Sequence, residues 1–291
     1  MPLFNVYPLY NVTPVRAKGV YVYDDNNTEY LDLYGGHAVI SIGHAHPKYV
    51  DAITNQVNNL GFYSNAIQNP LQVELADKIE KLSGCKDYEL FLCNSGAEAN
   101  ENALKLASFK TDKKRVIAFK NGFHGRTSAA VAATDNKNII APINAQQEVT
   151  ILDLNDIDNV KSELEKGDVC AVIVEFIQGV GGLDEATADF FEQVDALCKA
   201  NNTLFIADEV QSGYGRSGKF FAFQHYNVTP DIISIAKGMG NGFPIGGILI
   251  HPSIEAKFGM LGTTFGGNHL ACAAGLSVLN VIEEQNLIDN V

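Results

Sequence analysis

Lys237 is a lysine whose place in the sequence suggests a reactive amine. It follows the apolar run 232–236 (IISIA) and precedes a glycine-rich turn. Partial burial at the end of a strand disfavours the ammonium and favours the neutral amine, the form that can form an imine with an aldehyde. The alternative is an ordinary lysine whose aliphatic part packs along the strand end while its ammonium stays in solvent.

Asp208 follows a second apolar run, 204–207 (LFIA), in the same way. Ligands of open α/β sheets bind at the carboxyl ends of the strands. A carboxylate placed there can keep a pyridine nitrogen protonated, which makes the ring an electron sink. The alternative is a carboxylate that caps a neighbouring loop.

A small-residue turn at 94–100 (NSGAEAN) opens a helix. Its free backbone N–H groups, the Ser95 hydroxyl and the positive end of the helix suit a phosphate dianion. An ordinary N-cap, with Glu98 in the first turn, explains Ser95 almost as well.

The segment 122–127 (GFHGRT) adds an aromatic ring and a guanidinium. Phe123 offers a face for stacking, and Arg126 offers bidentate recognition of a carboxylate. Taken alone, Arg126 is equally consistent with a solvated or surface-paired arginine.

The elements that must position these residues indicate an α/β protein. A hairpin is expected over 20–33, and helical stretches then alternate with short apolar runs, as in strands buried on both faces of a parallel sheet. Helices are predicted after residue 96, around 191–198 and from about 268. We therefore expect a mostly parallel central sheet flanked by helices, with a small N-terminal β-containing segment. The strand runs are 116–119, 169–174, 204–207 and 232–236.

Charge and cysteine content restrict the partners and the compartment. The net charge is −13 over 291 residues and the pI is about 4.9, which disfavours nucleic acid. The five cysteines are odd in number and scattered, as in a reduced cytoplasmic protein, and no apolar run is long enough to span a membrane. His44 and His46 fit a turn before a helix, so we expect no metal site.

Taken together, six segments resemble the class III (ornithine-type) pyridoxal-phosphate aminotransferases, and within them the acetylornithine and succinylornithine group. The resemblance implies the fold type I of pyridoxal-phosphate enzymes. It divides the chain into an N-terminal segment of the small domain (1–45), a large cofactor-binding domain (46–267) and a helix (268–291) leading towards a C-terminal domain not present in the chain. The segments are 33–39 (LYGGHAV), 94–101 (NSGAEANE), 123–127 (FHGRT), 208–216 (DEVQSGYGR), 236–238 (AKG) and 263–268 (TTFGGN).

The same resemblance assigns residues to pyridoxal phosphate. Lys237 is implied to carry the cofactor as a Schiff base and to act as general base, and Asp208 to pair with the pyridine nitrogen. Gln211 is implied to approach the phenolic oxygen of the ring. The remaining implied contacts of the cofactor are Ser95, Gly96 and Ala97 at the phosphate, Thr264 reaching it across a homodimer interface, and Phe123 and His124 at the ring.

For the substrate, the resemblance implies Arg126 at a carboxylate and Thr263 near the acyl group. The expected reaction transfers an amino group from N-acetylornithine or N-succinylornithine to 2-oxoglutarate, in arginine biosynthesis. The alternatives are a class III enzyme acting on ω-amino acids or 4-aminobutyrate, and a non-catalytic cofactor-binding fragment. Two departures from the family pattern concern substrate choice: Phe176 stands where proline is common, and Val180 stands where glutamate is common.

Overall fold

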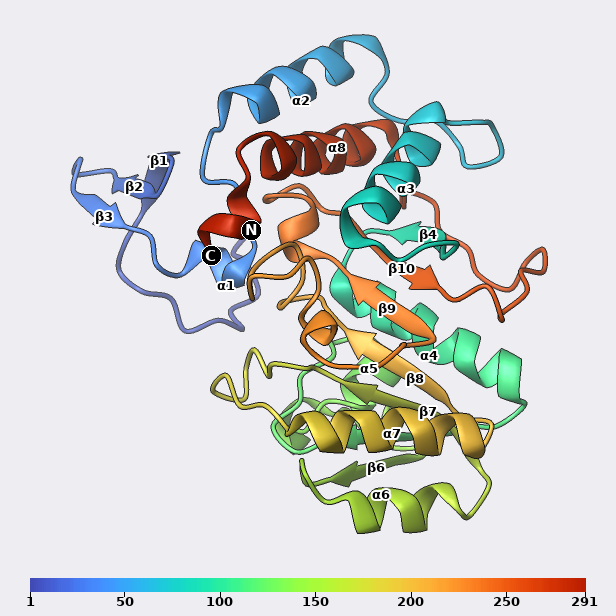
Figure 1. The fold of residues 1–291 in the computed structure, drawn as a ribbon. Coiled ribbons are helices and arrows are strands. Elements are labelled where there is room, and N and C mark those ends of the chain that lie inside the picture. Colours follow the sequence, from blue (N-terminus) through green and yellow to red (C-terminus); the bar gives the residue numbers. More distant parts are fainter.

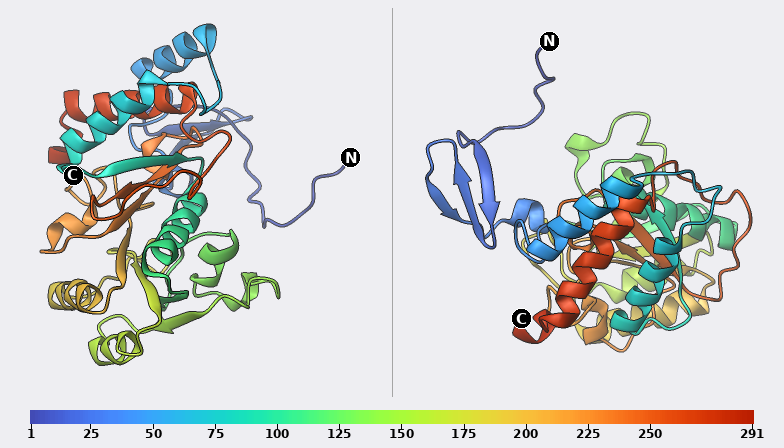
Figure 2. Two further views of the ribbon diagram at one scale, coloured as in Figure 1. Left: turned by 90° about the vertical axis from the view of Figure 1, so that its right-hand side faces the viewer. Right: turned by 90° about the horizontal axis from the view of Figure 1, so that it is seen from above.

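The computed structural model describes residues 1–291 and contains two sheets (Figure 1). The smaller sheet is antiparallel and includes the expected hairpin, whose turn is held by Asp24 Oδ1 accepting from the Thr28 backbone N–H at 2.8 Å. This sheet and the N-terminal segment project from the body of the molecule (Figure 2). The strands of the smaller sheet are β1 (Pro14–Lys18), β2 (Tyr21–Asp24) and β3 (Glu29–Leu31).

The larger sheet has the strand order β4-β10-β9-β8-β7-β5-β6. The pairs β8–β9, β7–β8, β5–β7 and β5–β6 are parallel, and only β10 runs against its neighbours. The expected mostly parallel sheet is therefore confirmed. Its strands are β4 (Glu89–Cys93), β5 (Arg115–Phe119), β6 (Val149–Leu152), β7 (Val169–Val174), β8 (Leu204–Asp208), β9 (Ile232–Ile235) and β10 (Gly246–Ile250).

Helices cover both faces of this sheet, and α2 packs on the outer side of α8. The three predicted helices are present as α4, α7 and α8. No helix is both long and apolar enough to cross a membrane. The helices are α1 (Gly35–Ala38), α2 (Pro47–Asn59), α3 (Pro70–Ser83), α4 (Gly96–Thr111), α5 (Ser128–Ala132), α6 (Ile157–Leu164), α7 (Ala188–Ala200) and α8 (His269–Glu284), with short 3-10 turns η1 (Lys137–Ile139), η2 (Ala222–His225), η3 (Lys237–Met239) and η4 (Leu287–Asn290).

Alternate side chains of the central strands point into two separate cores. On β5, Val116 and Ala118 pack with residues of α4, whereas Ile117 and Phe119 pack in the core that contains residues of α3, α6, α7 and α8. The strand runs are apolar apart from the buried Ser234, because both faces of the sheet are covered. The sheet is thus a rigid platform, and the residues at its carboxyl edge are held by it.

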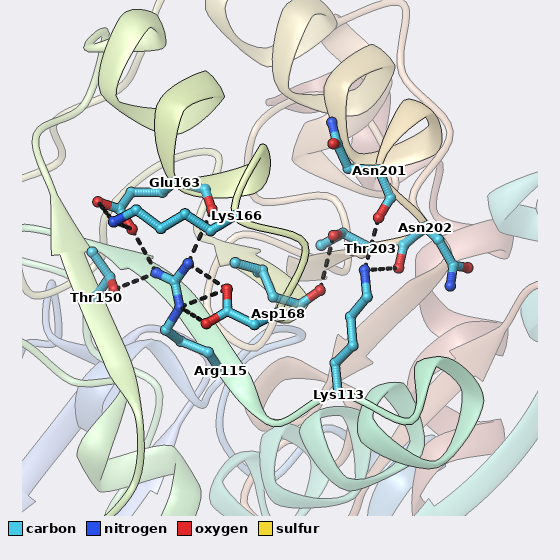
Figure 3. A network of polar contacts seen from close by, with 10 residues as sticks. Lys113, Arg115, Thr150, Glu163, Lys166, Asp168, Asn201, Asn202 and Thr203 are labelled. Carbon is cyan, nitrogen blue, oxygen red and sulfur yellow. Dashed lines mark hydrogen bonds and ion pairs between the residues drawn. The ribbon is translucent and has the colours of Figure 1, made fainter.

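A polar network lies at the opposite, amino edge of the parallel strands (Figure 3). Arg115, at the start of β5, donates to both carboxylate oxygens of Asp168 and to Glu163 Oε2 at 2.7 Å. It also donates to the Thr150 hydroxyl at 2.8 Å, so its guanidinium joins β5, β6, α6 and the loop before β7. This network stabilises the sheet far from the carboxyl edge.

Candidate active site

A cavity of about 370 Å³ lies at the carboxyl edge of the sheet. The segments that follow β4, β5, β7, β8 and β9 all reach it, because these strands point the same way. Nine of the residues that the sequence singled out line this cavity. They are Ser95, Gly96, Ala97, Phe123, His124, Arg126, Asp208, Gln211 and Lys237.

Lys237 lies at the first residue of η3 with a backbone φ of 45°, a conformation that non-glycine residues rarely adopt. Its side chain is half-buried and makes no hydrogen bond or ion pair within the chain. Burial lowers the pKa of Lys237, a shift that the charges of Asp208 and Glu175 oppose and that of Arg216 reinforces. The position therefore favours the neutral form of this unpaired amine more than an exposed position would.

Asp208 ends β8 inside a buried set of donors. Its Oδ2 accepts from His124 Nδ1 at 2.7 Å and from Asn100 Nδ2 at 2.7 Å, and its Oδ1 accepts from the Val210 backbone N–H at 3.1 Å. Burial opposes protonation of His124, but the hydrogen bond and charge of Asp208 outweigh it and raise the pKa of the imidazole. Asp208 is thus a carboxylate held in a fixed orientation by three hydrogen bonds.

Asn100, which the sequence did not single out, holds two parts of the site together. Its Nδ2 also donates to the His124 carbonyl at 2.7 Å, and the side chain is almost fully buried. Both neighbours are acceptors, so the amide nitrogen rather than the oxygen must face them. Its spacing of four residues from Gly96 was the available signal, since it puts Asn100 on the same face of α4.

Glu175, directly after β7, was likewise missed as a site residue. Its Oε1 accepts from the Phe123 backbone N–H at 2.8 Å and its Oε2 accepts from the Gly179 backbone N–H at 2.9 Å. Burial, together with the nearby charge of Asp208, raises the pKa of Glu175. The carboxylate places the Phe123 segment against the cavity.

The amino end of α4 forms a close-fitting cradle. Ser95 is the N-cap, and its Oγ accepts from the Glu98 backbone N–H at 3.2 Å, so the ordinary capping role is realised. A Cβ at Gly96 would lie 2.5 Å from Val210 Cγ1, so only glycine fits there without movement. The first turn of α4 therefore presents backbone N–H groups to the cavity with no side chain in the way, as an anion site requires.

Arg126 and Gln211 complete the lining of the cavity. Arg126 is exposed, and its guanidinium has no hydrogen-bond or ion-pair partner within the chain, which leaves its donors available to a ligand. Gln211 is packed against Gly179, where an added Cβ would lie 1.7 Å from Gln211 Oε1. The orientation of Gln211 thus depends on the absence of a side chain at residue 179.

The two threonines predicted for the site lie outside this cavity. Thr263 Oγ1 accepts from Asn94 Nδ2 at 3.4 Å, so it neighbours a lining residue, and Thr264 is exposed. Val180, expected to change the substrate side, is 65% exposed and does not line the cavity. Phe176 is fully buried among aromatic rings, with Phe191 at 4.4 Å between centroids, so its role is in the core.

The sequence is similar to those of known aminotransferases. Residues 5–291 match the family model "Aminotransferase class-III". Acetylornithine aminotransferase from Bacillus subtilis is 41% identical over 289 residues, which cover 98% of this chain and 74% of that protein.

Solved structures agree with this. The ornithine aminotransferase of Toxoplasma gondii superposes with a TM-score of 0.90 at 31% identity, over 97% of this chain and 69% of that one. The taurine:2-oxoglutarate aminotransferase of Bifidobacterium kashiwanohense, solved with PLP and glutamate, gives a TM-score of 0.87 at 27% identity, over 99% of this chain and 71% of that one. The chain therefore belongs to the class-III aminotransferase family.

Proposed function

We propose that this chain is a pyridoxal-phosphate-dependent aminotransferase that moves the amino group of N-acetylornithine, or of N-succinylornithine, to 2-oxoglutarate in arginine biosynthesis. The observation that carries the proposal is the meeting of three groups at one cavity: the free Lys237 amine, the Asp208–His124 pair and the amino end of α4. The 41% identity to an acetylornithine aminotransferase supports the substrate.

The residues present fit the cofactor in chemistry and in space. A lysine with a lowered pKa suits an aldehyde, a buried carboxylate suits a protonated ring nitrogen, and a helix terminus suits a phosphate. Gly96, where an added Cβ would clash with Val210, lines the cavity at that terminus. Lys237, Asp208, Gln211, Phe123, His124 and the turn 95–97 would hold the group.

When bound, pyridoxal phosphate supplies an aldehyde that condenses with amines and a protonated ring that accepts electrons. The chain's own residues then have separate tasks. Lys237 Nζ accepts the proton from the amino-bearing carbon of the donor and delivers it in the next stage, as a general base and then a general acid. Asp208 keeps its negative charge at the ring, and His124 and Asn100 keep Asp208 in place. Arg126 binds a substrate carboxylate.

We propose further that the enzyme works as a homodimer in the cytoplasm, with Thr264 completing the partner's phosphate site and Thr263 near the acyl group. The exposed position of Thr264 in one protomer is consistent with that role. The five cysteines are all buried and unpaired, as expected in a reducing compartment.

The test is a half-reaction with each donor. Mixing the loaded enzyme with N-acetylornithine or N-succinylornithine should convert the cofactor to its amine form, and 2-oxoglutarate should restore it. Failure of both donors would overturn the assignment of substrate. Conversion by amines that lack an α-carboxylate, with indifference to Arg126→Ala, would instead support the class III enzymes that act on ω-amines.

A further inference from the structure

The Glu101 carboxylate, on the second turn of α4, contacts the amino end of α5. Its Oε2 accepts from the Thr127 hydroxyl at 2.7 Å, from the Ala129 backbone N–H at 2.9 Å and from the Ala130 backbone N–H at 3.1 Å. Its Oε1 also accepts from the Ala129 N–H, at 3.0 Å. One side chain of α4 thus satisfies several donors at the start of another helix.

This arrangement replaces the usual cap of α5. Thr127 is the N-cap residue, but its own side chain does not cap the helix; it donates instead to Glu101 and to the Ala97 carbonyl, the latter at 3.2 Å. The first N–H groups of a helix have no partner within the helix and must be satisfied from elsewhere. Here they are satisfied by a charged group on the helix that carries the anion cradle.

Arg126 lies directly before Thr127, between two attachments to α4. Upstream, the His124 carbonyl accepts from Asn100, and Gly125 packs so closely that an added Cβ would lie 2.7 Å from Ala97 Cβ. Downstream, the Glu101 carboxylate accepts hydrogen bonds from Thr127, Ala129 and Ala130. The exposed guanidinium of Arg126 makes no contact of its own that would fix it. Its position over the cavity is therefore set by its backbone, and the downstream end of that backbone is set by Glu101.

We propose that Glu101 is a positioning residue for Arg126, and that it couples the substrate-carboxylate site to the α4 cradle. The proposal rests on the proposed function in one respect, the role of Arg126 in binding a carboxylate. Glu101 does not line the cavity and touches no substrate, so it acts through Thr127 and the start of α5.

Glu101→Gln is the informative substitution because it changes few atoms. A glutamine has one acceptor oxygen and one NH₂ group, so it cannot accept from all of these donors, and its NH₂ would face an N–H. The start of α5 should then loosen, and Arg126 with it. Thr127→Val removes the bridging hydroxyl, and Thr127→Ser retains it as the conservative rescue. Glu163→Gln is the matched control, because it removes a carboxylate at the amino edge of the sheet, far from the cavity.

The experiment measures binding of glutarate, an unreactive dicarboxylate, to the loaded enzyme by calorimetry, alongside KM and kcat for the donor. Glu101→Gln should weaken glutarate binding about tenfold and raise KM with little change in kcat, because a small displacement of a positioning group has this scale of effect. Thr127→Val should act in the same direction, Thr127→Ser should restore binding, and Glu163→Gln should leave it unchanged.

A double-mutant cycle separates positioning from general damage. If Glu101 acts through Arg126, adding Glu101→Gln to Arg126→Ala should weaken glutarate binding no further. Additive effects, or wild-type binding in Glu101→Gln, would overturn the proposal while leaving the aminotransferase function intact. A wild-type enzyme that binds glutarate but converts no donor would overturn the proposed aminotransferase function. The double-mutant cycle would still show whether Glu101 positions Arg126. Absence of glutarate binding in the wild type would overturn both.

Discussion

Oδ2 of Asp208 lies 2.7 Å from Nδ1 of His124, with both side chains almost fully buried. A buried carboxylate needs donors to stay charged, and the imidazole supplies one at the side away from solvent. The pair fixes the orientation of the carboxylate at the end of β8, where it lines the cavity.

The His124–Asp208 pair predicts a pH-dependent contribution to stability. The pKa of His124 is raised above its ordinary value of 6.5, since Asp208 outweighs the opposing effect of burial. Its contribution is therefore fully present below about pH 6.5 and is lost as the pH rises through the folded-state pKa. Urea unfolding of the cofactor-free chain should show a larger difference between wild type and His124→Gln near pH 6 than near pH 9. Equal differences at the two pH values would contradict this reading.

Asp208→Asn should fold but lose most of its activity. The amide retains the shape of the side chain and removes the negative charge that we propose faces the ring nitrogen of the cofactor, so turnover should fall by about 10²-fold or more. Asp195→Asn is the matched control, because Asp195 is also a buried carboxylate but does not line the cavity. Steady-state kinetics of the two variants check the prediction, and comparable losses in both would refute it.

Gly179→Ala should change the site without unfolding the chain. Its Cβ would lie 1.7 Å from Gln211 Oε1, and the end of a flexible side chain moves at little cost, so Gln211 should be displaced. We expect kcat/KM to fall about tenfold, with an altered visible spectrum of the loaded enzyme and an unchanged unfolding midpoint. Unchanged kinetics and an unchanged spectrum in Gly179→Ala would contradict this role of Gly179.

Arg115→Ala should reduce stability without affecting catalysis. The guanidinium is only 11% exposed and donates to Asp168, Glu163 and Thr150, so its loss should lower the free energy of unfolding by about 2 kcal/mol. Lys114→Ala, which removes an exposed ion pair with Glu148, should lower the free energy of unfolding far less than Arg115→Ala does. Denaturant unfolding measures both, and a changed KM in Arg115→Ala would show that the two edges of the sheet are coupled.

Much of the fold and site was predictable because the signals are local. Short, mainly apolar runs predicted β5, β7, β8 and β9, and a residue directly after such a run in a parallel sheet lies at the carboxyl edge. Lys237 and Asp208 were identified in this way. The antiparallel strand β10 was not anticipated, because its run of residues after a glycine-rich turn has no pattern that fixes its direction.

Contacts between segments that are distant in the sequence could not be predicted from local patterns. The spacing of Asn100 from Gly96 places it on the cavity side of α4, but nothing in the local sequence shows that its amide reaches Asp208, 108 positions away. The same holds for Glu175, whose two acceptor contacts depend on how the loops after β5 and β7 fold over the edge. The importance of Glu101 arises only from the approach of α5 to α4.

We propose that Lys237 bonds the cofactor, and reduction with borohydride tests this bond. The wild type, loaded with pyridoxal phosphate, should show a visible absorption band that borohydride removes, and digestion should recover the cofactor fixed to the peptide that contains Lys237. Lys237→Ala should show neither, and Lys219→Ala, at an exposed lysine away from the cavity, should behave as the wild type. A band that persists in Lys237→Ala, or a cofactor fixed to another lysine, would show that Lys237 does not bond the cofactor.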